Sequence, residues 1–96
     1  MATYSFSDAA IADLDEICAA MSEQSPDFAI RFFERVREKC RNFAKFPNMG
    51  KSYAEIRPNL RGIVVDNYII FYVPRSNGID VARIVSGYRD LESLAI

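Results

Sequence analysis

The sequence predicts an α+β fold: three C-terminal strands and one N-terminal strand form an antiparallel sheet, and a helical hairpin covers one face of it. Three observations support this prediction. Apolar residues recur at helical spacing over about residues 8–45, three runs rich in β-branched and aromatic residues follow them, and turn-forming residues separate those runs. A chain of 96 residues is too short for a second independent core. We therefore expect residues 1–96 to form one β-α-α-β-β-β domain.

The first predicted elements are a short strand, Ala2–Phe6, and a helix that follows it directly. Ser7 is a good N-cap residue, and Asp8 lies in the first turn, where the helix dipole favours an acid. The helix is expected to run to about Glu23. Its apolar face is formed by residues that recur at steps of three and four, namely Ala10, Ile11, Leu14, Ile17, Cys18 and Met21.

The second predicted helix begins with Ser25 as its cap and Pro26 at its first position, and it runs to about Lys45. Phe46-Pro47 ends it, because proline disfavours a helical residue before it. The short link to the first helix predicts an antiparallel hairpin. Packing on a sheet explains the apolar stripe, although a basic amphipathic helix is also typical of membrane or partner binding. The stripe comprises Ala29, Phe32, Phe33, Val36, Cys40 and Phe43.

Three strands are expected in the C-terminal half. Leu60–Val65 is the first, and Asp66-Asn67 is a two-residue turn in which both residue types tolerate positive φ. Tyr68–Val73 is aromatic and β-branched on both faces, as a buried central strand should be. After a turn over residues 74–78 comes the third strand, Ile79–Val85.

Simple alternation along the third strand places Val81, Arg83 and Val85 on one face. Gly87 ends this strand, and residues 89–94 are long enough for one short helical turn. The hairpin is expected to cover one face of the sheet. The opposite face would then be concave and partly polar, which makes it the natural binding surface.

The composition excludes several kinds of chemistry. The chain has no histidine, so a Ser–His or Cys–His nucleophile pair and the commonest metal ligand are absent. Cys18 and Cys40 match no metal-binding spacing and each falls on an apolar helical stripe, so we expect two reduced core thiols. A disulfide between two packed helices is geometrically possible but rare in cytosolic proteins. No metal or cofactor is expected.

The charges are segregated along the chain. Residues 1–27 carry six acids and no base, whereas residues 28–62 carry nine lysines and arginines and three glutamates. The basic middle part either faces an acidic partner or is an ordinary solvated helix face. The N-terminus lacks the features of a signal peptide, and no run is long enough to span a membrane. The expectation is a soluble cytoplasmic protein without membrane contact.

Four short motifs resemble one family. They are FP-x-M-G at residues 46–50, the pair Leu60-Arg61, NYIIFY at residues 67–72 and G-x-R-D at residues 87–90. Together, in this order and spacing, they resemble the toxins of bacterial type II toxin–antitoxin systems, in the superfamily that contains the RelE and ParE families. The resemblance covers nearly the whole chain. It implies a cognate antitoxin protein as partner, in a hetero-oligomeric complex.

The two branches of this superfamily differ in chemistry. RelE-type toxins resemble ribonucleases that cut messenger RNA on the ribosome, whereas ParE-type toxins resemble inhibitors of DNA gyrase. By the resemblance, a ribonuclease would carry an arginine at Ile69, an arginine at Arg89 and a tyrosine near Ala95; of these only Arg89 is present. Tyr88 lies next to Arg89 and should point elsewhere. A pI near 5.3 also suits ribosomal RNA poorly.

The sequence therefore favours a ParE-like gyrase inhibitor used in plasmid stabilisation. Two alternatives stay open. One is a ribosome-dependent messenger RNA endoribonuclease with Arg89 as a catalytic residue, and the other is an inactive family member that only binds its antitoxin. In the favoured reading no residue is catalytic.

Six residues are candidate contacts for the target or the antitoxin. Arg61 and Arg83 are expected to rim an apolar groove; otherwise Arg61 pairs with an acid such as Asp66 or Asp80, and Arg83 is half-buried and paired. Tyr88 and Arg89 follow the last strand, where Arg89-Asp90 could instead start a helix. Tyr53 and Met49 lie on the predicted loop.

Overall fold

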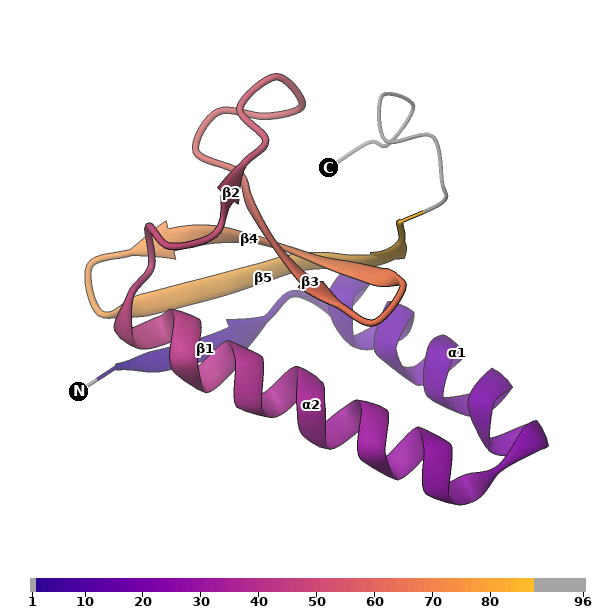
Figure 1. Ribbon diagram of the computed structural model, residues 1–96. Coiled ribbons are helices and arrows are strands. Elements are labelled where there is room, and N and C mark those ends of the chain that lie inside the picture. The colour runs from indigo at the N-terminus through magenta and orange to yellow at the C-terminus, as the bar shows by residue number, and fades with distance from the viewer. Residues whose placement is uncertain (1, 88–96) are drawn as a thin grey trace.

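In the computed structural model, which describes residues 2–87, two helices pack on one face of a five-stranded sheet (Figure 1). The predicted order of helices and strands is confirmed, and a short strand β2 is added before β3. The elements are β1 (Thr3–Phe6), α1 (Asp8–Gln24), α2 (Pro26–Lys45), β2 (Lys51–Ser52), β3 (Arg61–Val65), β4 (Tyr68–Arg75) and β5 (Gly78–Ser86).

Both helices begin at the predicted caps. The Ser7 side chain accepts a hydrogen bond from the backbone N–H of Ala10 at 3.0 Å, and Ser25 accepts one from Phe28 at 3.4 Å. Ser25 also donates its own N–H to Met21, so one residue ends α1 and starts α2. This tight link forces the two helices to run antiparallel.

The strands follow the order β1-β5-β4-β3-β2. The predicted antiparallel meander of β3, β4 and β5 is confirmed, and Asp66 has the positive φ expected in the first turn. Strand β1 pairs with β5 in parallel, so the sheet is mixed, whereas the sequence suggested antiparallel strands throughout. No hairpin turn joins β1 to β5. The chain between them runs through both helices and through β2, β3 and β4, and this long connection allows the parallel direction.

Gly78 makes the pairing of β1 with β5 possible. It is the residue opposite Thr3, and its φ of 153° lies in a region that side chains rarely adopt. A Cβ atom at Gly78 would lie 1.7 Å from the carbonyl oxygen of Thr3. Any other residue here would push β1 off the sheet.

Strand β5 contains a bulge that the simple alternation did not anticipate. Tyr72 of β4 pairs with Val81, but Phe71 pairs with Arg83, so Ala82 is an extra residue. The bulge reverses the alternation: Val81 packs on the helix side, and Arg83 shares the opposite face with Phe71. The predicted common face for Val81, Arg83 and Val85 is therefore wrong for Val81.

Two apolar clusters hold the fold together. The larger lies between the sheet and the helices, and it includes Phe32, Val36 and the thiol-bearing Cys40. The smaller lies on the opposite face of the sheet, where the loop between β2 and β3 folds back over β4. The predicted open concave face is thus partly covered, because the loop supplies its own apolar side chains. The smaller cluster comprises Tyr53, Leu60, Ile69, Phe71 and Val85, with Ile56 and Val73 at its border.

Candidate partner-binding surfaces

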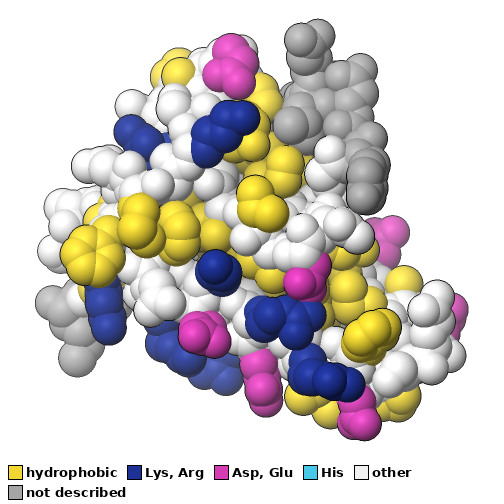
Figure 2. Space-filling view, viewed as in Figure 1, with side chains coloured by type: hydrophobic (Ala, Val, Ile, Leu, Met, Phe, Trp, Pro, Cys, Tyr) yellow, Lys and Arg dark blue, Asp and Glu magenta, His cyan; other side chains and the backbone are white. Residues whose placement is uncertain are grey.

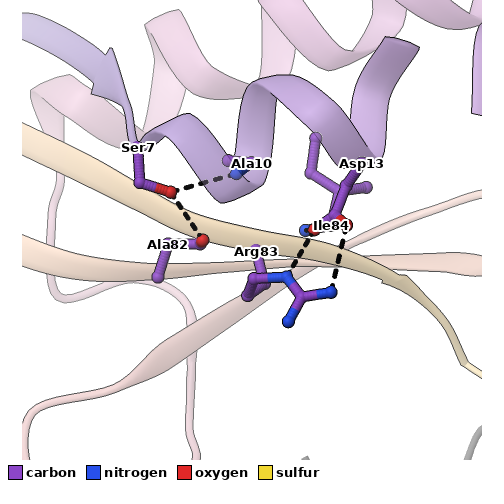
Figure 3. Close-up of polar contacts among 6 residues, drawn as sticks. All are labelled: Ser7, Ala10, Asp13, Ala82, Arg83 and Ile84. Carbon is purple, nitrogen blue, oxygen red and sulfur yellow. Dashed lines mark hydrogen bonds and ion pairs between the residues drawn. The ribbon is translucent and has the colours of Figure 1, made fainter. Parts of the chain in front are cut away.

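Arg83 of β5 forms an ion pair with Asp13 of α1. Its Nε and one terminal nitrogen donate to the Asp13 carboxylate of α1 at 2.6 and 3.0 Å, and both side chains are largely buried (Figure 3). The hydrogen bonds from Arg83 to Asp13 raise the pKa of the arginine above its ordinary value. Arg83 is therefore half-buried and paired, which was one of the two arrangements expected for it; the other was a place on the rim of a binding groove.

Asp13 also completes the edge of β5. Strand β1 ends opposite Val81, which leaves the next part of β5 without a strand beside it. Ser7 donates its hydroxyl to the Ala82 carbonyl at 2.8 Å, and Asp13 accepts the backbone N–H of Ile84 at 3.0 Å (Figure 3). Side chains at the start of α1 thus satisfy backbone groups that would otherwise lack partners.

Arg61 supports the loop after α2. Its guanidinium donates to the Gly50 carbonyl at 2.7 Å. The Tyr72 hydroxyl donates to the Pro47 carbonyl at 2.7 Å and accepts the N–H of Gly50 at 3.0 Å. Burial raises the pKa of Tyr72, which keeps this hydroxyl protonated. Arg61 therefore binds a carbonyl group in this loop.

The two acids suggested as partners for Arg61 are bound elsewhere. Asp66 pairs with Arg35 at 2.6 Å, and Asp80 pairs with Arg75. Arg61 and Arg83 lie on opposite faces of the sheet, because Arg61 is opposite Tyr72 and Arg83 is opposite Phe71. They do not rim one common groove.

The remaining predicted contact residues have different environments. Tyr53 is only 8% exposed, and its ring packs edge-on against Phe71 with centroids 5.0 Å apart. Its ring can reach a partner only if this packing opens. Met49 is exposed on the loop after α2. Tyr88 and Arg89 lie outside the described residues.

Ile69 occupies the position at which the resemblance implies an arginine in ribonucleases. It is 7% exposed and belongs to the smaller apolar cluster. An unpaired cation placed there would carry a large desolvation cost. In this chain Ile69 packs against the apolar side chains of the smaller cluster.

An apolar hollow lies on the helix side of the molecule, between α1, α2 and β1. Its volume is about 350 Å³, and we call it the hairpin groove. Two large apolar side chains border it and remain open, Phe33 at 42% and Ile11 at 48% exposed. The groove is lined by Tyr4, Phe6, Ile11, Leu14, Asp15, Phe33 and Arg37.

A second hollow, of about 370 Å³, continues the hairpin groove along β1 toward the N-terminus. It is lined by Ala2, Thr3, Tyr4, Arg41 and Lys45, and Tyr4 borders both hollows. The Arg37 guanidinium lies over the Phe33 ring, 6.0 Å from its centroid. The surface beside β1 therefore changes from apolar to basic. Figure 2 shows several lysine and arginine side chains over α2, with acidic side chains among them.

This groove was not predicted from the sequence, in which Ile11 and Phe33 fall on the apolar stripes expected to pack inside. A usable signal was present, because adjacent helix residues point about 100° apart and Phe32 and Phe33 cannot both face the core. Phe32 is fully buried, which leaves Phe33 at the surface.

The described residues include two free thiols and no cluster of metal-binding side chains. No group of three acidic, cysteine or histidine side chains is placed to hold a metal ion in that part of the chain. Cys18 and Cys40 are both free thiols. Neither of the described helices is long and apolar enough to cross a membrane.

Comparisons with known proteins agree with the fold. The profile of the family described as "ParE toxin of type II toxin-antitoxin system, parDE" matches residues 4–91. Among solved structures, the chain resembles a protein of the "Chromosomal ParDE TA system from P. aeruginosa", with a TM-score of 0.73 and 19% identity. The match covers 90% of this chain and 96% of that one, and at this identity it shows a shared fold. No curated protein matches the sequence.

Proposed function

Because the chain belongs to the ParE toxin family of type II toxin–antitoxin systems, we propose that it inhibits DNA gyrase and that a cognate antitoxin neutralises it by covering the hairpin groove. Membership in a two-component system of this kind implies an antitoxin partner. The target and the surface that the antitoxin covers are our proposals.

The exposed apolar side chains of the hairpin groove support the proposal that the antitoxin binds there. Phe33 on α2 and Ile11 on α1 both line the hairpin groove, and their exposure leaves this apolar hollow open to water. Covering apolar surface is the main favourable term in protein association. An antitoxin segment that folds onto the hairpin would bury these side chains and gain its affinity there.

Gyrase inhibition is favoured over RNA cleavage by the environment of Ile69. RNA cleavage needs groups that take a proton from the 2′-hydroxyl and stabilise charge on the phosphate. Ile69 supplies neither, and its neighbours in the smaller cluster are apolar. Binding another protein requires no such groups.

A supercoiling assay with purified gyrase tests the target. We expect supercoiling of relaxed DNA to fall as the protein is added and to recover when the cognate antitoxin is added as well. Full supercoiling at a large excess of the protein would overturn the gyrase proposal. A parallel assay in a translating extract should show no cut messenger RNA; cleavage that disappears with Arg89→Ala would establish the ribonuclease alternative.

A further inference from the structure

The outer edge of β1 has free backbone groups. The N–H of Thr3 donates to the carbonyl of Asn77, just before β5, at 2.8 Å, and the N–H of Ser7 donates to the carbonyl of Val81 in β5 at 2.9 Å. Because these groups alternate along a strand, the N–H groups of Tyr4 and Phe6 point to the other edge. No described residue pairs with them there, since β1 is the last strand of the sheet (Figure 1). Such an edge is a template for an added strand.

The surface beside this edge is apolar at one end of β1 and basic at the other. The hairpin groove, with Phe33 and Ile11, lies beside Phe6 at the C-terminal end of β1. Arg41 and Lys45 lie beside the N-terminal end, around Thr3. Strand β1 therefore runs from a basic surface toward an apolar one.

At the basic end, Arg41 and Lys45 form no ion pair with an acid among the described residues. The ion pairs within residues 2–87 involve Arg35, Arg75 and Arg83, and none involves Arg41 or Lys45. Both cations are therefore available to an acidic ligand. Charges on opposite sides of an interface set specificity and orientation more than affinity.

We propose that the outer edge of β1 accepts an extended segment of the antitoxin as an additional antiparallel strand, and that apolar residues precede acidic residues in this segment. The inference depends on the antitoxin partner proposed above. Antiparallel pairing is slightly more stable per residue than parallel pairing. In an antiparallel strand, the N-terminal residues lie beside Phe33 and Ile11, and the C-terminal residues lie beside Arg41 and Lys45. Every second side chain of this strand faces the helices, and these side chains are the ones expected to be apolar first and acidic later.

A second copy of the chain fits this edge less well. The strand that it would offer is its own β1, ATYSF from Ala2 to Phe6, which contains no acid. Edge-to-edge pairing of two copies would supply no acidic side chain from the added strand to Arg41 and Lys45. The charge pattern thus points to a different chain.

Peptide binding to the full-length protein tests the direction. Two labelled peptides have the same composition: one alternates valine with serine and then glutamate with serine, and the other has the reverse order. We expect the first peptide to bind at least about tenfold more tightly by fluorescence anisotropy, equivalent to ~1.4 kcal/mol. R41E combined with K45E should remove this preference, whereas R57E, an exposed arginine in the loop between β2 and β3, should preserve it. Equal affinities, or no binding of either peptide, would overturn the proposal.

Amide hydrogen exchange tests the strand itself. Exchange at Tyr4 and Phe6 should slow by about tenfold or more when the first peptide is bound, because their N–H groups gain partners. Unchanged exchange at these two amides in the bound state would show that the peptide does not extend the sheet, and it would overturn strand addition. The gyrase assay is independent of both measurements. If the protein does not inhibit gyrase but prefers the first peptide, only the gyrase target is rejected. If it inhibits gyrase but binds both peptides equally, only this inference is rejected.

Discussion

The carboxylate of Asp13 on α1 binds the guanidinium of Arg83 on β5 through two hydrogen bonds, at 2.6 and 3.0 Å. The same carboxylate accepts the N–H of Ile84, just after the bulge at Ala82. One acid thus joins the first helix to the last described strand and closes a sheet edge that β1 leaves open. The pair stabilises the fold around which the partner surfaces are arranged.

Removing this acid should destabilise the protein. Asp13→Ala leaves the largely buried guanidinium and the Ile84 N–H without an acceptor, so we expect the free energy of unfolding to fall by about 2–3 kcal/mol. Urea denaturation followed by circular dichroism measures the change. Asp15→Ala, on the exposed side of α1, is the matched control and should stay within about 0.5 kcal/mol of the parent protein. Equal effects of the two substitutions would contradict a specific role for the pair.

Gly78→Ala should disrupt the pairing of β1 with β5. The added methyl group would collide with the Thr3 carbonyl, and the residue would be held at an unfavourable φ. We expect a loss of roughly 3 kcal/mol or more in thermal or urea unfolding. Gly87→Ala, whose added carbon would have its nearest contact at 3.3 Å, is the control and should have a smaller effect. A Gly78→Ala protein as stable as the control would show that β1 has another way to pair.

Phe33→Ala should weaken binding of the cognate antitoxin by about tenfold or more, because the substitution removes an apolar contact from the hairpin groove. Folding should change little, since the side chain is 42% exposed. Isothermal titration calorimetry measures the affinity. Phe28→Ala is a matched control on the same helix, because Phe28 is 55% exposed and does not line the groove. An equal loss of affinity for both variants would argue against the groove as the binding surface.

Acid should remove the stabilisation provided by Asp80. The hydrogen bond from Ser5, and then the interactions with Arg75, lower the pKa of this carboxyl below its ordinary value of 3.8. A group whose pKa is lowered on folding stabilises the protein above its unfolded pKa and loses this effect as the pH falls through its folded pKa. Stability measured from pH 5 downward should therefore fall less steeply for Asp80→Asn than for the parent. Identical slopes below about pH 4 would contradict this.

Cys40 should be inert in the folded protein. Burial raises its pKa to about 12, so at pH 8 only roughly one thiol in ten thousand is ionised. In a Cys18→Ser variant, where Cys40 is the only thiol, reaction with Ellman's reagent should occur only through unfolding, and its rate should rise with urea. Rapid reaction without denaturant would show that the core opens at this position.

Much of the fold was predictable because its signals are local. Ser7, Ser25 and Pro26 start the helices through contacts within one turn of the chain. The turn at Asp66-Asn67 brings two neighbouring strands together, and the hydrophobic run of β4 marks it as a buried central strand. Each of these features depends on residues a few positions apart. The amino-acid sequence alone therefore determines the order of the elements and the family resemblance.

The partner surfaces depended on residues far apart in the chain. The parallel pairing of β1 requires Gly78 to meet Thr3, and the bulge at Ala82 turns Arg83 to the face opposite Val81. The loop after β2 buries Tyr53, while the packing of Phe32 leaves Phe33 open beside Ile11. No local pattern encodes these outcomes, because side-chain exposure and strand register are set only when distant segments pack together. The tertiary structure alone decided which apolar and basic side chains remain available to a partner.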